Sequence, residues 1–187
     1  MKSTLFIFLV SISLGLNAQT TIQNITLPNV VDGKMVSLDQ YSSLSGIVVV
    51  FASNECPFDN YYKERVKEMI RSYAGKIQFV LVNSYLEPEE SSEKMRIHYS
   101  DIGVPYLADK DQLAMNSLGA KKSPEVFLLK YSANKLVSIY SGAIDDNPQV
   151  PKDVSQNFLK DAIDKLLNGQ NIEVATNRAV GCSIRRK

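Results

Sequence analysis

Residues 47–57 read IVVVFASNECP, and this stretch decides the fold of the chain. Its first five residues form an unbroken apolar run, which predicts a buried strand followed by a short loop. A helix then begins at Cys56-Pro57, because proline is favoured in the first turn, where its missing N–H leaves no bond unmade. Apolar side chains recur every three to four residues from Phe58 to Tyr73, and Gly75 can end this amphipathic helix.

Cys56 is the first candidate catalytic residue, since the predicted helix places its thiol at a helix N-terminus. The helix dipole and the unpaired N–H groups there favour the thiolate, the nucleophilic form, and we expect this sulfur to be accessible. The carboxylates of Glu55 and Asp59 act in the opposite direction, because nearby negative charges raise the pKa of a thiol. The sequence leaves open which influence prevails, and a buried inert thiol is the alternative.

The first 18 residues are typical of a cleaved secretory signal. They contain Lys2, an apolar run from Leu5 to Leu16 that is too short to span a bilayer, and the small residue Ala18. We expect cleavage after Ala18, with residues 19–187 forming a single domain in the periplasm or outside the cell. No cysteine lies near that point, which argues against a lipid anchor.

The composition is that of an ordinary globular protein of 187 residues, with 44% hydrophobic and 22% charged side chains. The chain without its signal carries 20 basic against 20 acidic groups. This balance gives no indication of nucleic acid or a membrane surface as a partner. There is no Gly-x-Gly-x-x-Gly motif or phosphate loop, so we expect no cofactor.

Periodicity in the rest of the chain predicts a sheet built around the central strand and helix. The helix that follows residue 57 is read as a crossover between two parallel buried strands. The expected elements are hairpin strands at 25–28 and 35–38, buried strands at 47–51 and 77–82, a mostly solvated helix at 88–101, an extended segment at 104–108, a helix at 110–118, antiparallel strands at 125–129 and 136–140, a last helix at 154–166, and a tail at 172–187.

Two further positions allow more than one interpretation. Ser123-Pro124 stands directly before a predicted strand, where the proline fits either a simple strand start or a cis peptide bond. His98 is the only histidine, and its place on a solvated helix favours a surface or packing residue over a catalytic base. Because a second histidine and a Cys-x-x-Cys pair are both absent, we expect no metal site.

Five blocks of the sequence resemble, in order, the peroxiredoxin-like branch of the redoxin family, the alkyl hydroperoxide reductase/thiol-specific antioxidant proteins. They are residues 51–57, 104–109, 119–127, 140–146 and 181–184. The resemblance covers nearly the whole mature chain. It implies an α/β thioredoxin-like fold, in which helices flank a central mixed β-sheet, with an N-terminal β-hairpin as an extension.

The resemblance also implies roles for individual residues. Cys56, followed by Pro57, falls on the peroxidatic cysteine and on the first cysteine of a thioredoxin Cys-x-x-Cys pair. Asp59 occupies the second position of that pair, which excludes a disulfide between those two positions. Ser123-Pro124 falls on the cis-proline of the fold, which lies beside the active cysteine and shapes the groove for substrates.

The chain departs from the peroxiredoxin pattern Pro-x-x-x-Thr-x-x-Cys at two positions. Val49 replaces the proline, and Ser53 replaces the threonine, where this branch often has a cysteine. The Ser53 hydroxyl could hydrogen-bond a thiolate or a peroxide oxygen, or it could merely bond a loop amide. No arginine stands at a motif matching the one with which peroxiredoxins hold the peroxide.

Cys182, in the tail, is the second cysteine. It could resolve a sulfenic acid on Cys56 by forming a disulfide, could be a permanent staple to Cys56, or could be free. Pairing requires the tail to fold back across the domain, because a disulfide needs a Cα separation of about 4.4–6.8 Å.

These observations predict an exported thiol-dependent oxidoreductase with Cys56 as its nucleophile. In the first hypothesis Cys56 reduces peroxides as an antioxidant, and Cys182 or an external thiol reductant restores it. In the second, Cys56 exchanges with thiols and disulfides of other exported proteins. The third is a redoxin-fold binding or metal-handling module without catalysis. The sequence leaves the oligomeric state open.

Overall fold

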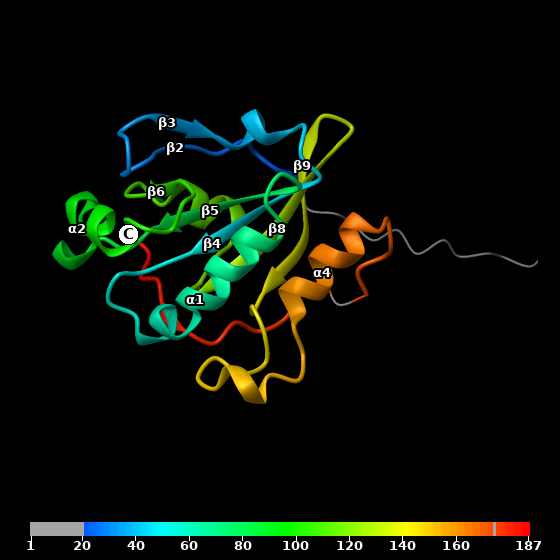
Figure 1. The fold of residues 1–187 in the computed structure, drawn as a ribbon. Helices are drawn as coiled ribbons and strands as arrows, with labels where there is room; N and C mark the ends of the chain where they lie inside the picture. The colour runs from blue at the N-terminus through cyan, green and yellow to red at the C-terminus, as the bar shows by residue number, and fades with distance from the viewer. Residues whose placement is uncertain (1–20, 174) are drawn as a thin grey trace, which may run out of the picture.

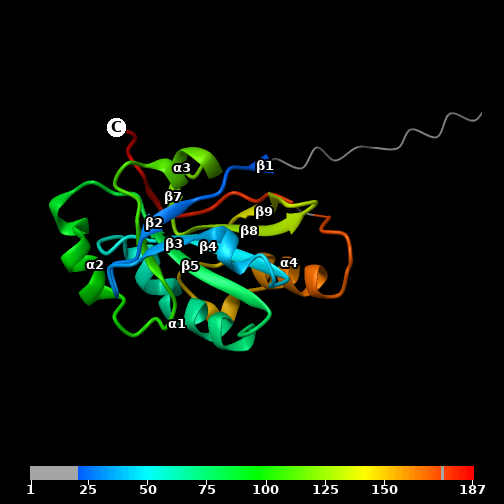
Figure 2. The ribbon, with the colours of Figure 1, turned by 90° about the horizontal axis from the view of Figure 1, so that it is seen from above.

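A computed structural model describes residues 21–173 and 175–187, so the predicted signal at 1–18 lies outside the described residues. In Figure 1 a twisted sheet crosses the molecule, and the hairpin formed by β2 and β3 lies along one of its edges. Figure 2 shows α1 and α4 on one face of this sheet and α3 on the other. The mixed sheet flanked by helices agrees with the fold expected from the sequence.

The elements agree with most of the expected ones in type and order. They are β1 (Thr21–Ile22), β2 (Thr26–Pro28), β3 (Met35–Ser37), η1 (Leu38–Tyr41), β4 (Gly46–Phe51), α1 (Pro57–Ser72), β5 (Ile77–Asn83), η2 (Pro88–Glu90), α2 (Ser92–His98), β6 (Tyr106–Ala108), α3 (Leu113–Leu118), β7 (Lys122–Ser123), β8 (Glu125–Ser132), β9 (Lys135–Gly142), η3 (Pro151–Asp153), α4 (Phe158–Leu167) and β10 (Cys182–Ser183).

The main sheet has the strand order β1-β9-β8-β4-β5-β6. Strand β4 lies at its centre, parallel to β5 and antiparallel to β8. The predicted crossover through α1 is therefore confirmed, as is the antiparallel pair β8 and β9. This arrangement places the carboxyl end of β4, and with it the start of α1, next to the beginning of β8.

Strand β4 is buried on both faces, as its continuous apolar run predicts. Val48 and Val50 belong to the core cluster that α1 and α4 cover. Val49 and Phe51 point into a second cluster on the opposite face, together with the hairpin and α3. Alternate side chains of one strand thus join two cores, because successive residues of a strand point to opposite faces.

Two predicted helices differ from the structure. The helix expected at 88–101 is a 3-10 turn followed by α2. Most of its residues are exposed, as expected, but Glu90 and Met95 are buried, at 2% and 0% exposed. The helix expected at 110–118 begins only at Leu113, after the N-cap Gln112, and the buried carboxylate of Asp109 accepts hydrogen bonds from the N–H groups of Ala114 and Met115 in its first turn. Both misses involve carboxylates that other segments bury.

The last predicted helix also begins later than its apolar pattern suggested. Val154 ends the 3-10 turn η3, and α4 starts at Phe158.

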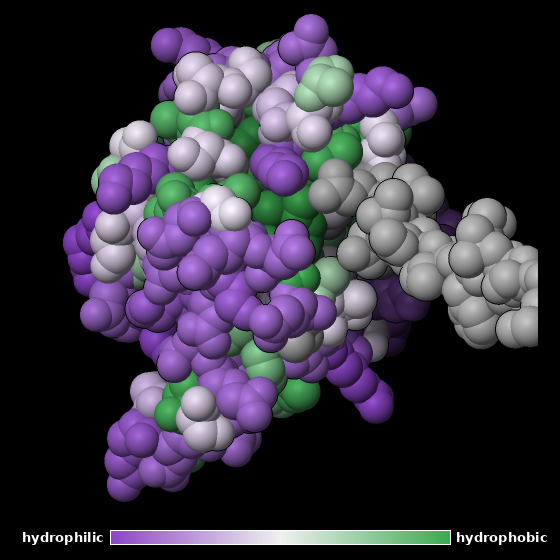
Figure 3. All heavy atoms as spheres, turned by 90° about the vertical axis from the view of Figure 1, so that its right-hand side faces the viewer, coloured by the Kyte–Doolittle hydropathy of each residue, from purple (hydrophilic) through white to green (hydrophobic). Residues whose placement is uncertain are grey.

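Large exposed apolar side chains in the described residues are spread over separate segments, among them Val31, Ile97 and Val180. The face seen in Figure 3 is accordingly covered largely by hydrophilic residues. Of the helices at 21–173 and 175–187, none is both long and apolar enough to cross a membrane.

The tail returns across the molecule, as the red segment in Figure 1 shows. The N–H of Asn177 donates to the carbonyl oxygen of Ser141 at 2.9 Å, and the N–H of Ser141 donates to Ala175 O at 3.0 Å. At Gly142 the two segments are so close that a Cβ atom would lie 1.8 Å from the carbonyl oxygen of Asn177. A glycine is required there for the tail to lie against the end of β9.

Replacing this glycine gives a test of the tail's position. We expect Gly142→Ala to lower the free energy of unfolding of the oxidised protein by at least about 3 kcal/mol, because backbone strain and a main-chain clash act together. Gly75→Ala is the matched control, since Gly75 also has a positive φ, of 77°, but no atom within 4 Å of the new Cβ. Urea unfolding of both variants measures the difference, and equal losses would contradict the predicted clash.

Candidate active site

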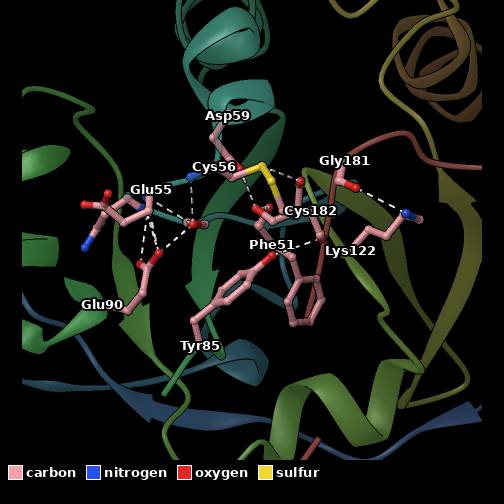
Figure 4. Close-up of a disulfide and its surroundings, with 12 residues drawn as sticks. Phe51, Glu55, Cys56, Asp59, Tyr85, Glu90, Lys122, Gly181 and Cys182 are labelled. Carbon is pink, nitrogen blue, oxygen red and sulfur yellow. Dashed lines mark hydrogen bonds between the residues drawn. A yellow bond between two sulfur atoms is a disulfide. The ribbon is translucent and has the colours of Figure 1, made fainter. Parts of the chain in front are cut away.

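The two cysteines of the chain form a disulfide, although 126 residues separate them. The Cα atoms of Cys56 and Cys182 are 5.9 Å apart, within the range that a disulfide tolerates. Figure 4 shows this bond at the N-terminal end of α1. Of the three states considered for Cys182, the free thiol is therefore not the one in this structure.

Cys56 has the position predicted from its neighbour Pro57. It is the N-cap residue of α1, with extended backbone, and Pro57 follows as the first helical residue. The prediction that the Cys56 sulfur is accessible is wrong for the oxidised protein, because Cys56 is only 2% exposed. Cys182 is half-buried. Cys182 is bonded to this sulfur, and strand β10 pairs with the adjoining β7.

The cis peptide considered at Ser123-Pro124 is present. The Sγ atom of Cys56 lies 3.3 Å from the carbonyl oxygen of Ser123. Residues 67 positions apart in sequence are thus brought together by the antiparallel pairing of β4 and β8. In the reduced protein this carbonyl oxygen is placed to accept a hydrogen bond from the Cys56 thiol.

The Ser53 hydroxyl is engaged within the loop that precedes α1. It donates to Glu90 Oε1 at 2.5 Å and accepts hydrogen bonds from the N–H groups of Glu55 and Cys56, each at 3.1 Å. This agrees with the alternative in which Ser53 bonds loop amides. Its one proton is committed to a carboxylate, so the hydroxyl is not available to donate to a peroxide in this state.

Glu90 is a residue at the site that the sequence did not reveal. Besides Ser53, its carboxylate accepts hydrogen bonds from Asn54 N at 2.9 Å and from Asn83 Nδ2 at 2.6 Å. The ammonium of Lys110 donates to the Glu90 main-chain oxygen at 2.7 Å, and burial lowers the pKa of this lysine. No local signal separates Glu90 from its exposed neighbour Glu89, because the donors come from segments remote in sequence.

Asp59 lies in the first turn of α1, where it is 3% exposed beside the disulfide (Figure 4). The Ser123 Oγ atom is 2.6 Å from Asp59 Oδ2 and 3.1 Å from the carbonyl oxygen of Phe51. One hydroxyl proton cannot serve both acceptors, so both contacts are hydrogen bonds only when Asp59 is protonated and donates to Ser123. Burial, above all, raises the pKa of Asp59 well above its usual value, and the negative charge of Glu90 adds to this.

A protonated Asp59 changes the electrostatics expected from the sequence. As a neutral group it does not oppose the Cys56 thiolate, so the influence of the helix N-terminus is less opposed than predicted. Glu55, the other expected carboxylate, is exposed to solvent, which screens its charge. Asp59 and Glu55 therefore oppose the Cys56 thiolate less than sequence reasoning indicated, whereas the burial of Cys56 and the Ser123 carbonyl oxygen, which accepts from the thiol, act against the thiolate.

The hydroxyl of Tyr85 donates to the main-chain oxygen of Cys182 at 3.0 Å, and burial raises the pKa of this phenol.

His98 packs edge-on against Tyr99, with ring centroids 4.7 Å apart, as expected of a packing residue. Across 21–173 and 175–187, no three His, Cys, Asp or Glu side chains gather in a way that could hold a metal ion.

Comparisons with known proteins bear on the fold. No protein-family model and no curated protein matches this chain. Among solved structures, a hypothetical protein of Sinorhizobium meliloti 1021 is 29% identical with a TM-score of 0.80, and the match covers 95% of this chain and 97% of that one. An uncharacterized conserved protein of Geobacillus kaustophilus is 28% identical with a TM-score of 0.81, over 90% and 92% of the two chains.

A third solved structure carries a name that describes an activity. It is a putative thiol:disulfide interchange protein DsbE of Chlorobium tepidum, 17% identical with a TM-score of 0.60, and the match covers 82% of this chain and 99% of that one. At this identity the likeness concerns the fold alone. It does not separate the peroxiredoxin-like branch from other proteins of the same architecture. The chain has the thioredoxin-like fold.

The Glu90 network gives a second prediction. We expect Glu90→Gln to lower the free energy of unfolding by about 1–3 kcal/mol. One accepting oxygen then becomes an amide NH₂, which faces the donor of Ser53 at Oε1 or those of Asn54 and Asn83 at Oε2. Glu89→Gln, a change at an exposed neighbour, is expected to have no measurable effect. Urea unfolding measures the free energy of unfolding of both variants. Equal stability of Glu90→Gln and wild type would contradict the described network.

Asp59 gives a prediction about pH. Because its pKa is raised in the folded state, the folded protein retains this proton after the unfolded chain has lost it. Stability therefore falls as pH rises from the unfolded pKa toward the folded one, by about 1.4 kcal/mol for each unit between them. We expect Asp59→Asn to remove this fall, as measured by urea unfolding at intervals from pH 4 to 8. Exposed Asp153→Asn is the control, and a profile of Asp59→Asn parallel to wild type would contradict the prediction.

Proposed function

We propose that this protein is an exported thiol-disulfide oxidoreductase in which Cys56 and Cys182 form one redox couple. The observation that carries the proposal is the disulfide between them at the start of a 16-residue helix, beside the cis peptide at Ser123-Pro124. A helix N-terminus stabilises a thiolate, and a stabilised thiolate is the better leaving group in exchange. This couple therefore suits reversible transfer of two electrons.

The reaction needs no cofactor, because the electrons move between sulfur atoms. Two thiols of a partner lose two electrons and two protons and become a disulfide, while the bond between Cys56 and Cys182 becomes two thiols; the reverse oxidises the partner. Partners are protein thiols or disulfides met outside the cytoplasm, in keeping with the expected signal at 1–18. The likeness in fold to the putative thiol:disulfide interchange protein of Chlorobium tepidum supports this choice.

The residues around the couple have positioning roles in this proposal. Pro57 starts the helix at Cys56, and the Ser123 carbonyl oxygen accepts a hydrogen bond from the Cys56 thiol after reduction. Ser53 and Glu90 hold the preceding loop, so the sulfur keeps its place when the disulfide opens. None of these groups has to move for the reaction.

Peroxide reduction is the second candidate, and one observation favours it. Cys182 is already in bonding distance of Cys56, so it can resolve a sulfenic acid without a rearrangement of the tail. In that reaction the Cys56 thiolate attacks the peroxide and releases an alcohol or water, and Cys182 then displaces water to form the disulfide. The Ser53 hydroxyl donates its proton to Glu90 and so cannot donate to the peroxide, which argues against rapid attack of Cys56 on a peroxide.

The two candidates differ in which oxidant acts on the reduced protein. We expect a glutathione redox buffer to interconvert dithiol and disulfide reversibly, and hydrogen peroxide at equal concentration to oxidise the protein at least about 100-fold more slowly than a protein disulfide substrate does. Mass spectrometry after alkylation follows both reactions. Faster oxidation by peroxide would favour the second candidate.

Cysteine variants provide the control for both candidates. Cys56→Ser and Cys182→Ser should each abolish the two-electron couple, leaving a single thiol that forms only mixed disulfides. A disulfide that no thiol can reduce in the folded protein would contradict the enzymatic proposal and favour a permanent staple in a binding module.

A further inference from the structure

We propose that external thiols exchange at the sulfur of Cys182, and that Cys56 is the leaving group, because the docked tail keeps Cys56 covered. The docked tail is here residues 175–187. The inference rests on the proposed function and adds the direction of attack. It reverses the expectation from the sequence, in which Cys56 meets the partner and Cys182 only resolves.

The first support is that contacts independent of the disulfide hold the tail on both sides of Cys182. The ammonium of Lys122 donates to Gly181 O at 3.1 Å, and Tyr85 Oη donates to Cys182 O at 3.0 Å. The N–H of Ile184 donates to Lys121 O at 2.9 Å, and the Ile184 side chain is 7% exposed in the core beneath the hairpin. None of these contacts involves a sulfur atom, so breaking the S–S bond removes none of them directly.

Gln112 fixes the last residues of the tail. Its Nε2 donates to Arg185 O at 2.7 Å, and its Oε1 accepts from the N–H of Lys187 at 2.9 Å. Gln112 is itself 1% exposed. The anchoring therefore extends from residue 181 to the end of the described chain, and Cys182 stays beside Cys56 in the reduced protein.

The second support is that β10 leaves no room along β7. Cys182 stands opposite Ser123 in the antiparallel pair, and a Cβ atom on Gly181 would lie 2.1 Å from the carbonyl oxygen of Ser123. An external chain cannot pair with β7 while the tail is in place. A partner's sulfur therefore has to approach from the solvent side of the tail.

The third support is that access and leaving-group chemistry select the same sulfur. Cys182 is half-buried, whereas Cys56 is 2% exposed. Exchange is faster when the departing thiolate has the lower pKa, and the N-terminus of α1 stabilises a thiolate on Cys56. Attack on Cys182 expels this stabilised thiolate, whereas attack on Cys56 would expel an ordinary one.

The step balances as two successive displacements. A partner thiolate attacks Sγ of Cys182, a bond forms between these sulfurs, and the electron pair of the old disulfide leaves on Sγ of Cys56. A second partner thiolate then attacks the partner's sulfur in the mixed disulfide and releases Cys182 as a thiolate. The partner's two thiols end as a disulfide, and the protein gains two electrons.

The first experiment locates the mixed disulfide. Oxidised wild-type protein is mixed with less than one equivalent of glutathione, quenched with acid within milliseconds to seconds, alkylated and digested. We expect glutathione on Cys182 at least about ten times more often than on Cys56. Predominant modification of Cys56 would overturn this inference while leaving the proposed function intact. No mixed disulfide at either cysteine would overturn the proposed function, and the inference with it.

The second experiment tests whether the tail covers Cys56. In Cys182→Ser protein, oxidised glutathione should modify Cys56 at least about ten times more slowly than it modifies Cys182 in Cys56→Ser protein, although Cys56 has the more stabilised thiolate. Adding Ile184→Ala, which removes the buried anchor, should raise the rate at Cys56. Adding Val180→Ala, at a tail residue that is 50% exposed, should not. Equal rates for these two variants would overturn the inference.

Discussion

The close approach of β10 to β7 is the contact on which the site depends. It requires a residue without a side chain at Gly181, and it sets Cys182 opposite Ser123. The same Ser123 presents its carbonyl oxygen to the Cys56 sulfur and its hydroxyl to Asp59. One short pair of strands therefore holds the two cysteines, the cis peptide and a buried acid in a single arrangement, which the disulfide then joins covalently.

A second set of contacts holds the other side of this arrangement. The Glu90 carboxylate accepts hydrogen bonds from Ser53 and Asn54 and thereby holds the loop that leads into α1. Buried carboxylates are tolerated only when several donors surround them, and Glu90 has those donors. The sulfur of Cys56 thus lies between a loop fixed by Glu90 and a strand fixed by the tail, and neither has to move during exchange.

These constraints explain why the chain can lack the second cysteine of a Cys-x-x-Cys pair. Asp59 occupies that position, where burial raises the pKa of its carboxyl group and the Ser123 hydroxyl lies 2.6 Å from it. The partner cysteine is supplied by the C-terminal tail, whose many anchors keep the two sulfurs together at high effective concentration. The architecture is thioredoxin-like, while the redox couple that we propose is assembled from the start of α1 and the C-terminal tail.

The sequence by itself determined the strand, loop and helix around Cys56, because apolar period and proline position are local properties. It also predicted the hairpin and the crossover helix, and it marked Ser123-Pro124 as a possible cis peptide bond. The resemblance to known redoxins indicated the fold. It could not show that Glu90 is buried, that burial raises the pKa of Asp59, or that Cys182 pairs with Cys56. Those features depend on which remote segments meet, since burial and hydrogen-bond partners are decided only when the tail and the sheet pack together.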